Sequence, residues 1–160
     1  MNKENSQVAI DWHWSSFDEL SCPELYAILK LRQEIFVVEQ KCIYLDCDDL
    51  DQISWHLRGM ISTGSQHTLG TYLRVIPPGA ANQYPAIGRL LTRKKLRNQT
   101  IAGQLLEQAI SRINKIYPES PIQISAQLHL EPFYNSFKFI STSAPYDEDG
   151  IAHIEMIRSG

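Results

Sequence analysis

The sequence predicts a single domain, covering residues 1–160, of the α/β (α+β) class. Three observations support this prediction: a length that can bury one core, a hydrophobic content of 43%, and strand patterns that alternate with helix patterns. The order is strand, helix, hairpin, strand, helix, strand, helix and two more strands, which excludes a purely up-and-down sheet. No repeat or interdomain linker interrupts this order.

The first strand and the first helix are predicted from an alternating segment and a capping motif. Residues 10–14 alternate apolar and polar side chains, which is typical of a half-buried strand. Residues 21–24 read Ser-Cys-Pro-Glu, a capping box with proline in the first turn, so we expect a helix to begin there. The apolar stripe of this helix consists of Leu25, Ile28, Leu29, Ile35 and Phe36.

The middle of the chain predicts a hairpin, a central strand and the longest helix. Residues 55–61 and 68–76 alternate about a Gly-Ser turn, which indicates a hairpin. Residues 86–91 are mostly apolar with one glycine, which favours a buried strand with a bulge or a close backbone approach. A single apolar stripe at helical spacing then runs through residues 101–116.

The last third predicts a strand, a short helix and a final pair of strands. Residues 122–126 alternate, and a proline near the start of residues 131–137 favours a helix. We expect the last two strands at residues 139–145 and 151–157. They are joined by residues 146–150, which contain the Asp-Gly pair typical of hairpins.

Charge and composition exclude several classes of protein. The formal net charge of −3 argues against a nucleic-acid binder. The polar residues 1–7 precede no apolar run, so we expect a cytoplasmic protein without a membrane partner. Three cysteines, an odd number, fit a reducing compartment. Cys42 and Cys47 with His56 lack the spacing of a zinc site, so no metal is predicted.

Two charged residues stand on the stripe of the first helix. Arg32 occupies a position where an apolar residue was due, and Glu39 follows on the same side. An unpaired buried charge is strongly unfavourable, so Arg32 needs a partner. Glu39 is the natural one, and the competing carboxylates are Asp46, Asp48, Asp49 and Asp51. The pair is either a structural contact or part of an active cleft.

The loop before the longest helix has the character of an anion site. The first turn of a helix presents unpaired N–H groups and the positive end of its dipole. Ala102 and Gly103 keep side chains out of the way there, while Arg97, Lys94 and Lys95 add positive charge. This chemistry indicates binding of a pyrophosphate.

Three segments resemble one family, the GNAT acyl-CoA-dependent N-acyltransferases. The family signature of Arg or Gln, two residues, Gly, one residue, and Gly or Ala is matched by Arg97 and Ala102, with Thr100 at the first glycine. Residues 36–40, Phe-Val-Val-Glu-Gln, with nearby Arg, Cys, Tyr and acidic residues, resemble the ElaA-like subgroup. Residues 134–139 resemble the Tyr-x-x-x-Gly-Phe segment, with lysine at the glycine position.

The resemblance implies a fold and a reaction. The fold is expected to be a mixed, mostly antiparallel twisted sheet with helices on both faces. The reaction is expected to be acetyl transfer from acetyl-CoA to a primary amine, small molecule or peptide, by direct attack in a ternary complex. Acidic residues near Glu39, with residues 147–149 of the last hairpin, indicate a cationic acceptor. We expect a monomer or homodimer.

The resemblance also implies roles for individual residues. Tyr134 is expected to protonate the departing thiolate, since the reference pKa of a phenol, about 10, is close to that of a thiol, about 8.5. Gly88 is expected to let the central strand open, so that backbone groups at Leu90, Leu91 and Thr92 reach the pantetheine and the thioester. The residues expected to bind the pyrophosphate are Arg97, Asn98, Gln99, Thr100, Ile101, Ala102, Gly103 and Gln104.

The acceptor amine arrives mostly protonated, so a base must take its proton. Glu39 is the first candidate for that base, with His129 and His153 as alternatives. His56, Gln127 and His129 are expected to contact the acceptor.

Two other interpretations of the chain stay open at this point. One is an acyl-CoA-binding sensor or interaction protein without turnover. The other is a thiol enzyme that uses Cys42 or Cys47 with a histidine.

Overall fold

The computed structural model describes residues 9–63, 65–97 and 100–160. Within these ranges one sheet has the strand order β1-β2-β3-β4-β5-β8-β6, and β7 also pairs with β8. Only the β4–β5 pair is parallel, so the predicted mixed, mostly antiparallel sheet is confirmed. The strands are β1 (Ile10–Ser16), β2 (Trp55–Thr63), β3 (Gln66–Ile76), β4 (Ala86–Thr92), β5 (Ile122–Gln127), β6 (Phe139–Ser141), β7 (Tyr146–Glu148) and β8 (Ile151–Arg158).

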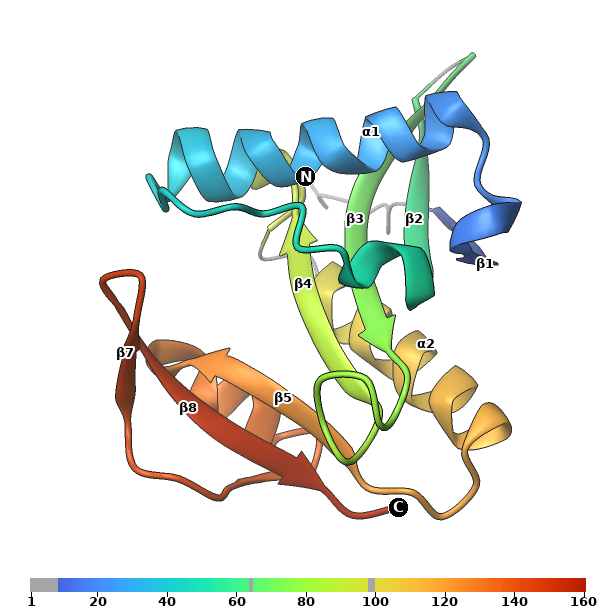
Figure 1. Cartoon of the computed structure of the whole chain (residues 1–160). Helices are drawn as coiled ribbons and strands as arrows, with labels where there is room; N and C mark the ends of the chain where they lie inside the picture. Colours follow the sequence, from blue (N-terminus) through green and yellow to red (C-terminus); the bar gives the residue numbers. More distant parts are fainter. Residues whose placement is uncertain (1–8, 64, 98–99) are drawn as a thin grey trace, which may run out of the picture.

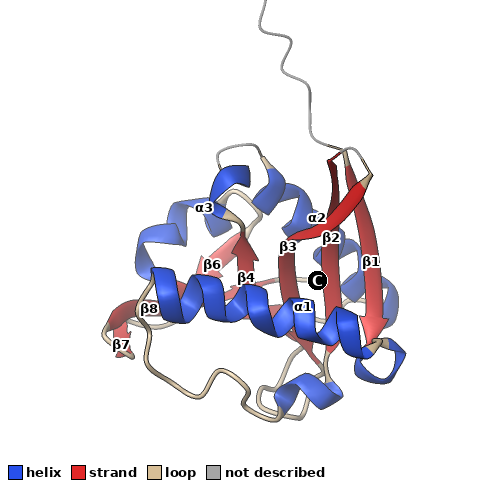
Figure 2. Ribbon diagram, turned by 90° about the horizontal axis from the view of Figure 1, so that it is seen from above, coloured by secondary structure: helices blue, strands red, loops and turns tan. Residues whose placement is uncertain are grey.

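Helices cover both faces of the sheet, as the resemblance implied (Figure 1). The helices are α1 (Cys22–Arg32), continued by the π-helix η2 (Gln33–Glu39), then α2 (Ile101–Ile116) and α3 (Glu131–Asn135). Seen from above, α1 crosses one face of β2, β3 and β4, and α2 lies behind the opposite face (Figure 2). None of the helices in the described ranges is long and apolar enough to cross a membrane.

Two apolar clusters fill the layers on either side of the sheet. The larger joins the stripe of α2, including Leu105 and Ile113, to β-strand residues such as Leu73. The smaller joins Ile28 and Leu31 of α1 to the other face, where alternation along β3 presents Tyr72, and to Ile35 and Phe36 of η2. The apolar stripes of the helices therefore pack against the apolar positions of the strands, as the sequence predicted.

Helix α1 begins at the predicted capping box but buries a different stripe. The backbone N–H of Ser21 donates to Glu24 Oε2 at 2.8 Å, and the Glu24 N–H donates to Ser21 Oγ at 3.4 Å. Leu31 and Arg32 are buried, whereas Leu25 and Leu29 are only half-buried. The change of pitch into η2 then keeps Ile35 and Phe36 on the buried side.

The central strand opens away from its parallel neighbour. Strands β4 and β5 pair only at Ala86–Gln123 and Ile87–Ile124, and they diverge beyond that point (Figure 1). The register against β3 shifts between Tyr72 and Arg74, and Arg89 has a φ of 54°, so the predicted bulge in this strand is present. On the side that faces β5, the backbone groups of β4 past Ile87 therefore border an opening and do not pair with a strand.

One predicted strand is divided in the structure. The sequence indicated a continuous strand at residues 139–145, but β6 ends at Ser141 and β7 begins at Tyr146. Both pair with the same edge of β8, β6 at residues 156–158 and β7 at residues 151–153. Pro145 has no N–H to donate to a ladder, which favours a loop between the two strands.

Candidate active site

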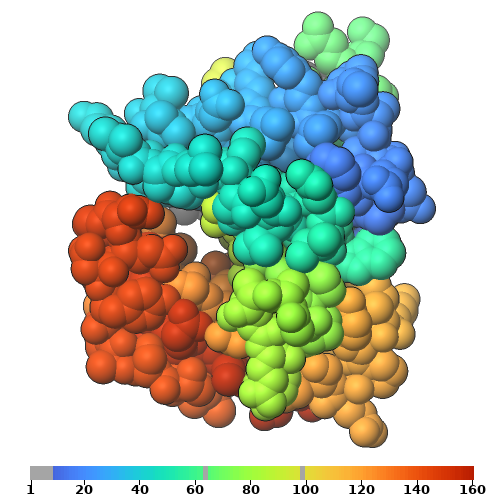
Figure 3. Space-filling view, in the orientation of Figure 1, coloured from blue at the N-terminus to red at the C-terminus, as the bar shows by residue number. Residues whose placement is uncertain are grey.

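A cavity of about 350 Å³ occupies the opening between β4 and β5. Its walls come from β4, β5 and β8, from the β7–β8 hairpin, and from the segment that follows η2. The space-filling view shows a hollow at this place, between the C-terminal strands and the segment around residues 40–50 (Figure 3). The fold thus brings the first and last thirds of the chain to one site.

Tyr134 reaches this cavity from α3. Its side chain is 4% exposed, and its ring contacts the rings of Phe133 and Phe139 at centroid distances of 5.0 and 6.0 Å. No residue in the described ranges shares a hydrogen bond with its hydroxyl. Burial raises the pKa of Tyr134 well above its usual range, so the phenol keeps its proton. The site therefore contains a protonated donor on a buried ring, for which the described residues provide no acceptor.

An arginine–aspartate network forms the wall opposite the C-terminal strands. Arg32, which is fully buried, donates to Asp46 Oδ2 and Asp51 Oδ1, both at 2.7 Å. Arg74 donates to both oxygens of Asp48, at 2.6 and 2.7 Å. The third arginine is Arg89, whose Nε lies 2.7 Å from Asp46 Oδ1 and whose Nη2 lies 3.1 Å from Asp48 Oδ2.

The network corrects two sequence predictions. Arg32 does not pair with Glu39; its partners Asp46 and Asp51 were among the competing carboxylates. The acidic segment also does not attract an external cation through these residues, because three arginines neutralise three aspartates. Burial alone would raise the pKa of Asp48, but its hydrogen bonds with Arg74 and the charge of Arg89 lower it to about 2.

Glu39 lies away from the cavity that Tyr134 lines. It forms an ion pair with Arg97 and borders a second hollow of about 590 Å³, together with Lys94 and Lys95. The hydrogen bond from Arg97 lowers the pKa of Glu39, whereas a general base needs a pKa near the working pH. Neither its place nor its pKa supports the predicted role of Glu39 as base.

The three histidine predictions have different outcomes. His56 is fully buried, with Tyr72 Oη 2.8 Å from Nδ1 and the Asp51 carbonyl 2.9 Å from Nε2, and burial lowers its pKa. The prediction that His56 contacts the acceptor is therefore wrong. His129 is exposed and does not line the cavity.

His153 lines the cavity and is oriented by its own strand. Its Nδ1 lies 2.8 Å from the carbonyl oxygen of Ile151, which can only accept, so Nδ1 carries the proton and Nε2 is the acceptor in the neutral ring. The ring stacks against Tyr146 at a centroid distance of 6.2 Å. Gln127 also lines the cavity, and its amide donates to Gln40 Oε1 at 3.4 Å.

The predicted pyrophosphate segment surrounds the start of α2. Asn98 and Gln99 lie outside the described residues, and Ile101 is buried in the core. Ala102, Gly103 and Gln104 form the half-buried first turn, where a Cβ on Gly103 would meet Phe137 at 3.3 Å. None of these residues lines the Tyr134 cavity. The same holds for Leu91 and Thr92, which are buried, whereas Leu90 lines it.

At two positions this chain has another residue where the family signatures have glycine. The backbone has a positive φ at both. Thr100, the residue before α2, has a φ of 61°, and Lys138 has a φ of 67°. The left-handed region is costly for a β-branched residue such as threonine and nearly free for glycine. The Thr100 side chain does not cap α2, and Arg97, three residues before it, forms an ion pair with Glu39.

Sequence reasoning missed one group of polar residues on the cavity wall. Ser125, Tyr146 and Glu155 are joined by hydrogen bonds of 2.5 and 2.6 Å through the Tyr146 hydroxyl. A signal for Ser125 and Glu155 exists, because residues 122–127 and 153–156 alternate between apolar and polar side chains. The polar positions that this alternation turns away from the core are the ones that meet at the cavity.

The opened β4–β5 pair and the buried tyrosine at the cavity fit an N-acyltransferase. The chain belongs to the GNAT acetyltransferase family: the pattern of the Acetyltransferase (GNAT) domain matches residues 51–159. It falls with the ElaA-related members. It is 36% identical to Protein ElaA of Escherichia coli over 93% of this chain and 96% of that protein, and 43% identical to a UPF0039 protein of Synechocystis sp. over 94% and 96%.

Solved structures agree with this assignment. An acyl-CoA N-acyltransferase from Pseudomonas aeruginosa superposes with a TM-score of 0.87 at 36% identity, covering 94% of this chain and 99% of that one. The crystal structure of Escherichia coli ElaA superposes with a TM-score of 0.86 at 35% identity and the same coverage. Among the described residues no cluster of His, Cys, Asp and Glu has the arrangement of a metal site.

Proposed function

We propose that this protein transfers the acetyl group of acetyl-CoA to a primary amine by direct attack in a ternary complex. The observation that carries the proposal is Tyr134: its buried ring lines the cavity at the opening of the sheet, and its protonated hydroxyl has no acceptor among the described residues. We further propose that the protein is cytoplasmic and is a monomer or a homodimer. Neither nucleic acids nor membranes are among its proposed partners.

The donor is held by the backbone of two elements. The first turn of α2, with its small side chains, binds the pyrophosphate through its N–H groups. On the side that faces β5, β4 has no strand partner beyond Ile87, although Leu91 and Thr92 still pair with β3 on the other side. We propose that the backbone groups of residues 90–92 that face β5, foremost those at Leu90 in the cavity wall, bind the pantetheine and the thioester carbonyl. Donors aimed at that carbonyl stabilise the negative charge that develops on its oxygen.

Two side chains move the protons. His153 Nε2 first takes one proton from the ammonium and releases it to solvent, which frees the nitrogen lone pair. As the nitrogen then bonds to the carbonyl carbon, Nε2 takes the second proton, so that a neutral amide forms. The carbon–sulfur bond then breaks, and Tyr134 donates its hydroxyl proton to the departing sulfur. Solvent at the open cavity returns a proton to Tyr134 and takes one from His153, so the enzyme is restored. His153 thus replaces Glu39 as the proposed base.

The exchange His153→Gln tests this base. We expect kcat/KM near neutral pH to fall about tenfold, with recovery at alkaline pH, where the amine arrives already deprotonated. The pH–rate profile of thiol release measures it, and His129→Gln is the matched control because that ring is exposed and outside the cavity. An unchanged profile for His153→Gln would remove His153 from the mechanism.

Ligand stabilisation followed by turnover tests the function itself. Acetyl-CoA and CoA at one hundred times Kd should stabilise the fold by about 2.7 kcal/mol, and an unrelated nucleotide should not. Free thiol should then appear from acetyl-CoA only when a primary amine is present. Stabilisation without thiol release from any amine would favour the sensor interpretation instead.

The thiol-enzyme interpretation receives little support from the cysteines. Cys42 lines the cavity, but burial and the nearby charge of Asp149 raise the pKa of its thiol, which disfavours the reactive thiolate. Cys47 is exposed and Cys22 is remote in sequence from the cavity segments. Full acetyl transfer by a variant with both Cys42→Ser and Cys47→Ser would exclude the thiol enzyme.

A further inference from the structure

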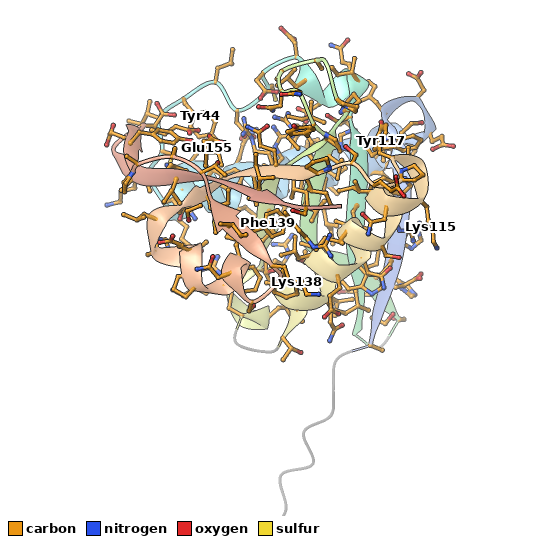
Figure 4. The ribbon with its side chains drawn as sticks, turned by 90° about the horizontal axis from the view of Figure 1, so that it is seen from below. Tyr44, Lys115, Tyr117, Lys138, Phe139 and Glu155 are labelled. Atoms are coloured by element: carbon orange, nitrogen blue, oxygen red, sulfur yellow. The ribbon has the colours of Figure 1, made fainter. Side chains whose placement is uncertain are left out.

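We infer that the acceptor carries a second cationic group besides the amine that is acetylated, and that Glu155 binds this second group. The inference rests on the proposed function and adds the class of acceptor: an alkyl diamine or a similar amine with a second charge. Glu155, a residue of β8 that is labelled in Figure 4, lines the same cavity as Tyr134 and His153.

Glu155 is held in place but has no counter-charge. The Tyr146 hydroxyl donates to its Oε1 at 2.6 Å, and the Gln123 amide donates to its Oε2 at 3.1 Å. An ionised carboxylate has about four acceptor positions, so two of them remain open. No cation in the described ranges forms an ion pair with it. The result is an oriented anion on a cavity wall.

The charge balance of the cavity leaves this anion unmatched. On the opposite wall, Arg74 and Arg89 are each bound by aspartates of the buried network. Glu148 and Asp149, at the tip of the β7–β8 hairpin, also line the cavity without an ion-pair partner among the described residues. The matched arginines cannot neutralise these carboxylates, so the C-terminal wall has a net negative charge.

Tyr134 independently indicates that a ligand completes this cavity. It is 4% exposed and lines the same cavity, yet its hydroxyl has no hydrogen-bond partner in the described part of the chain. The hydroxyl is the polar end of an otherwise buried ring, so it can donate a hydrogen bond to a ligand in the cavity. A ligand that fits this cavity therefore has a cationic group, which binds the Glu155 carboxylate, and a reacting group, which lies near the Tyr134 hydroxyl.

A second charge follows from the chemistry of the attacking nitrogen. That nitrogen must lose a proton to become a nucleophile, so the nitrogen of a monoamine has less positive charge in the transition state than in the bound ammonium. The carboxylates would then attract a monoamine more strongly in the ground state than in the transition state, which opposes catalysis. A second ammonium group stays charged throughout the reaction. Its attraction to Glu155 therefore lowers the energy of the transition state as well as that of the ground state.

The test compares butane-1,4-diamine with pentylamine, in which a methyl group replaces the second ammonium. The readout is the ratio of their kcat/KM values in thiol release, in the wild-type protein and in Glu155→Gln. Differences in amine basicity cancel when the two ratios are compared. We expect Glu155→Gln to lower the ratio about tenfold, the size of one charged hydrogen bond, chiefly through the diamine.

Glu107→Gln is the matched control, since Glu107 is exposed on α2 and outside both hollows, and it should leave the ratio unchanged. Should Glu155→Gln fail to fold, Glu148→Gln on the exposed hairpin takes its place. Equal loss for both amines, or no change in the ratio, would overturn the inference while thiol release still supported acetyl transfer.

Calorimetry of the two amines with the protein separates binding from turnover. Diamine binding that exceeds pentylamine binding and is lost in Glu155→Gln supports the inference even if no thiol is released, in which case the proposed function fails and the acceptor site stands. Absence of selective binding together with absence of selective turnover overturns it.

Discussion

Replacing Tyr134 with phenylalanine is expected to lower kcat for acetyl transfer about a hundredfold, the lower end of the range for a general acid. The ring stays between Phe133 and Phe139, so packing is preserved and only the hydroxyl is lost. Because the proton is given only as the carbon–sulfur bond breaks, kcat and kcat/KM should fall together while the Kd of acetyl-CoA stays unchanged. Steady-state thiol release and a binding titration measure both quantities.

The matched control is Tyr26→Phe, which removes a hydroxyl from a tyrosine that is 70% exposed on α1. This variant should have wild-type kinetics. If Tyr134→Phe retained wild-type kcat, the departing thiolate would take its proton from solvent, and Tyr134 would be a cavity-lining residue without a catalytic role.

The second large effect concerns stability. Arg32→Met should reduce the free energy of unfolding by about 3–5 kcal/mol, the range for breaking a buried ion pair from one side. Methionine fills part of the volume, but Asp46 and Asp51 lose the guanidinium that binds them both, including the 2.6 Å bond from Arg32 Nη2 to the Asp46 carbonyl. Urea unfolding followed by circular dichroism measures the change.

Lys30→Met provides the comparison on the same helix. Lys30 is largely exposed, and its Nζ lies 4.0 Å from Glu34, a surface pair of the kind that contributes little. Its removal should change stability by less than about 1 kcal/mol. A similarly small effect of Arg32→Met would show that the network is not the main attachment of residues 46–51 to the sheet.

Local patterns predicted most of the fold. The capping box at Ser21 starts α1, the stripe of residues 101–116 is α2, and the two alternating segments around residue 64 are the β2–β3 hairpin. These features depend on contacts within one or two turns or between adjacent strands. The division of residues 139–145 into β6 and β7 was missed because it depends on how both strands share one edge of β8.

The sequence by itself determined the order of elements, the family resemblance and the place of Tyr134 in its motif, because each of these is a pattern of neighbouring residues. Only the tertiary structure decided which charges pair. Arg32 binds Asp46, fourteen positions away, and Arg97 binds Glu39, fifty-eight positions away. Several carboxylates were chemically suitable partners for each arginine, and the packing of the chain determines which of them lies close enough to pair. As a result, Glu39 lies outside the cavity, and Glu155 lines it without an ion-pair partner among the residues that the structure describes.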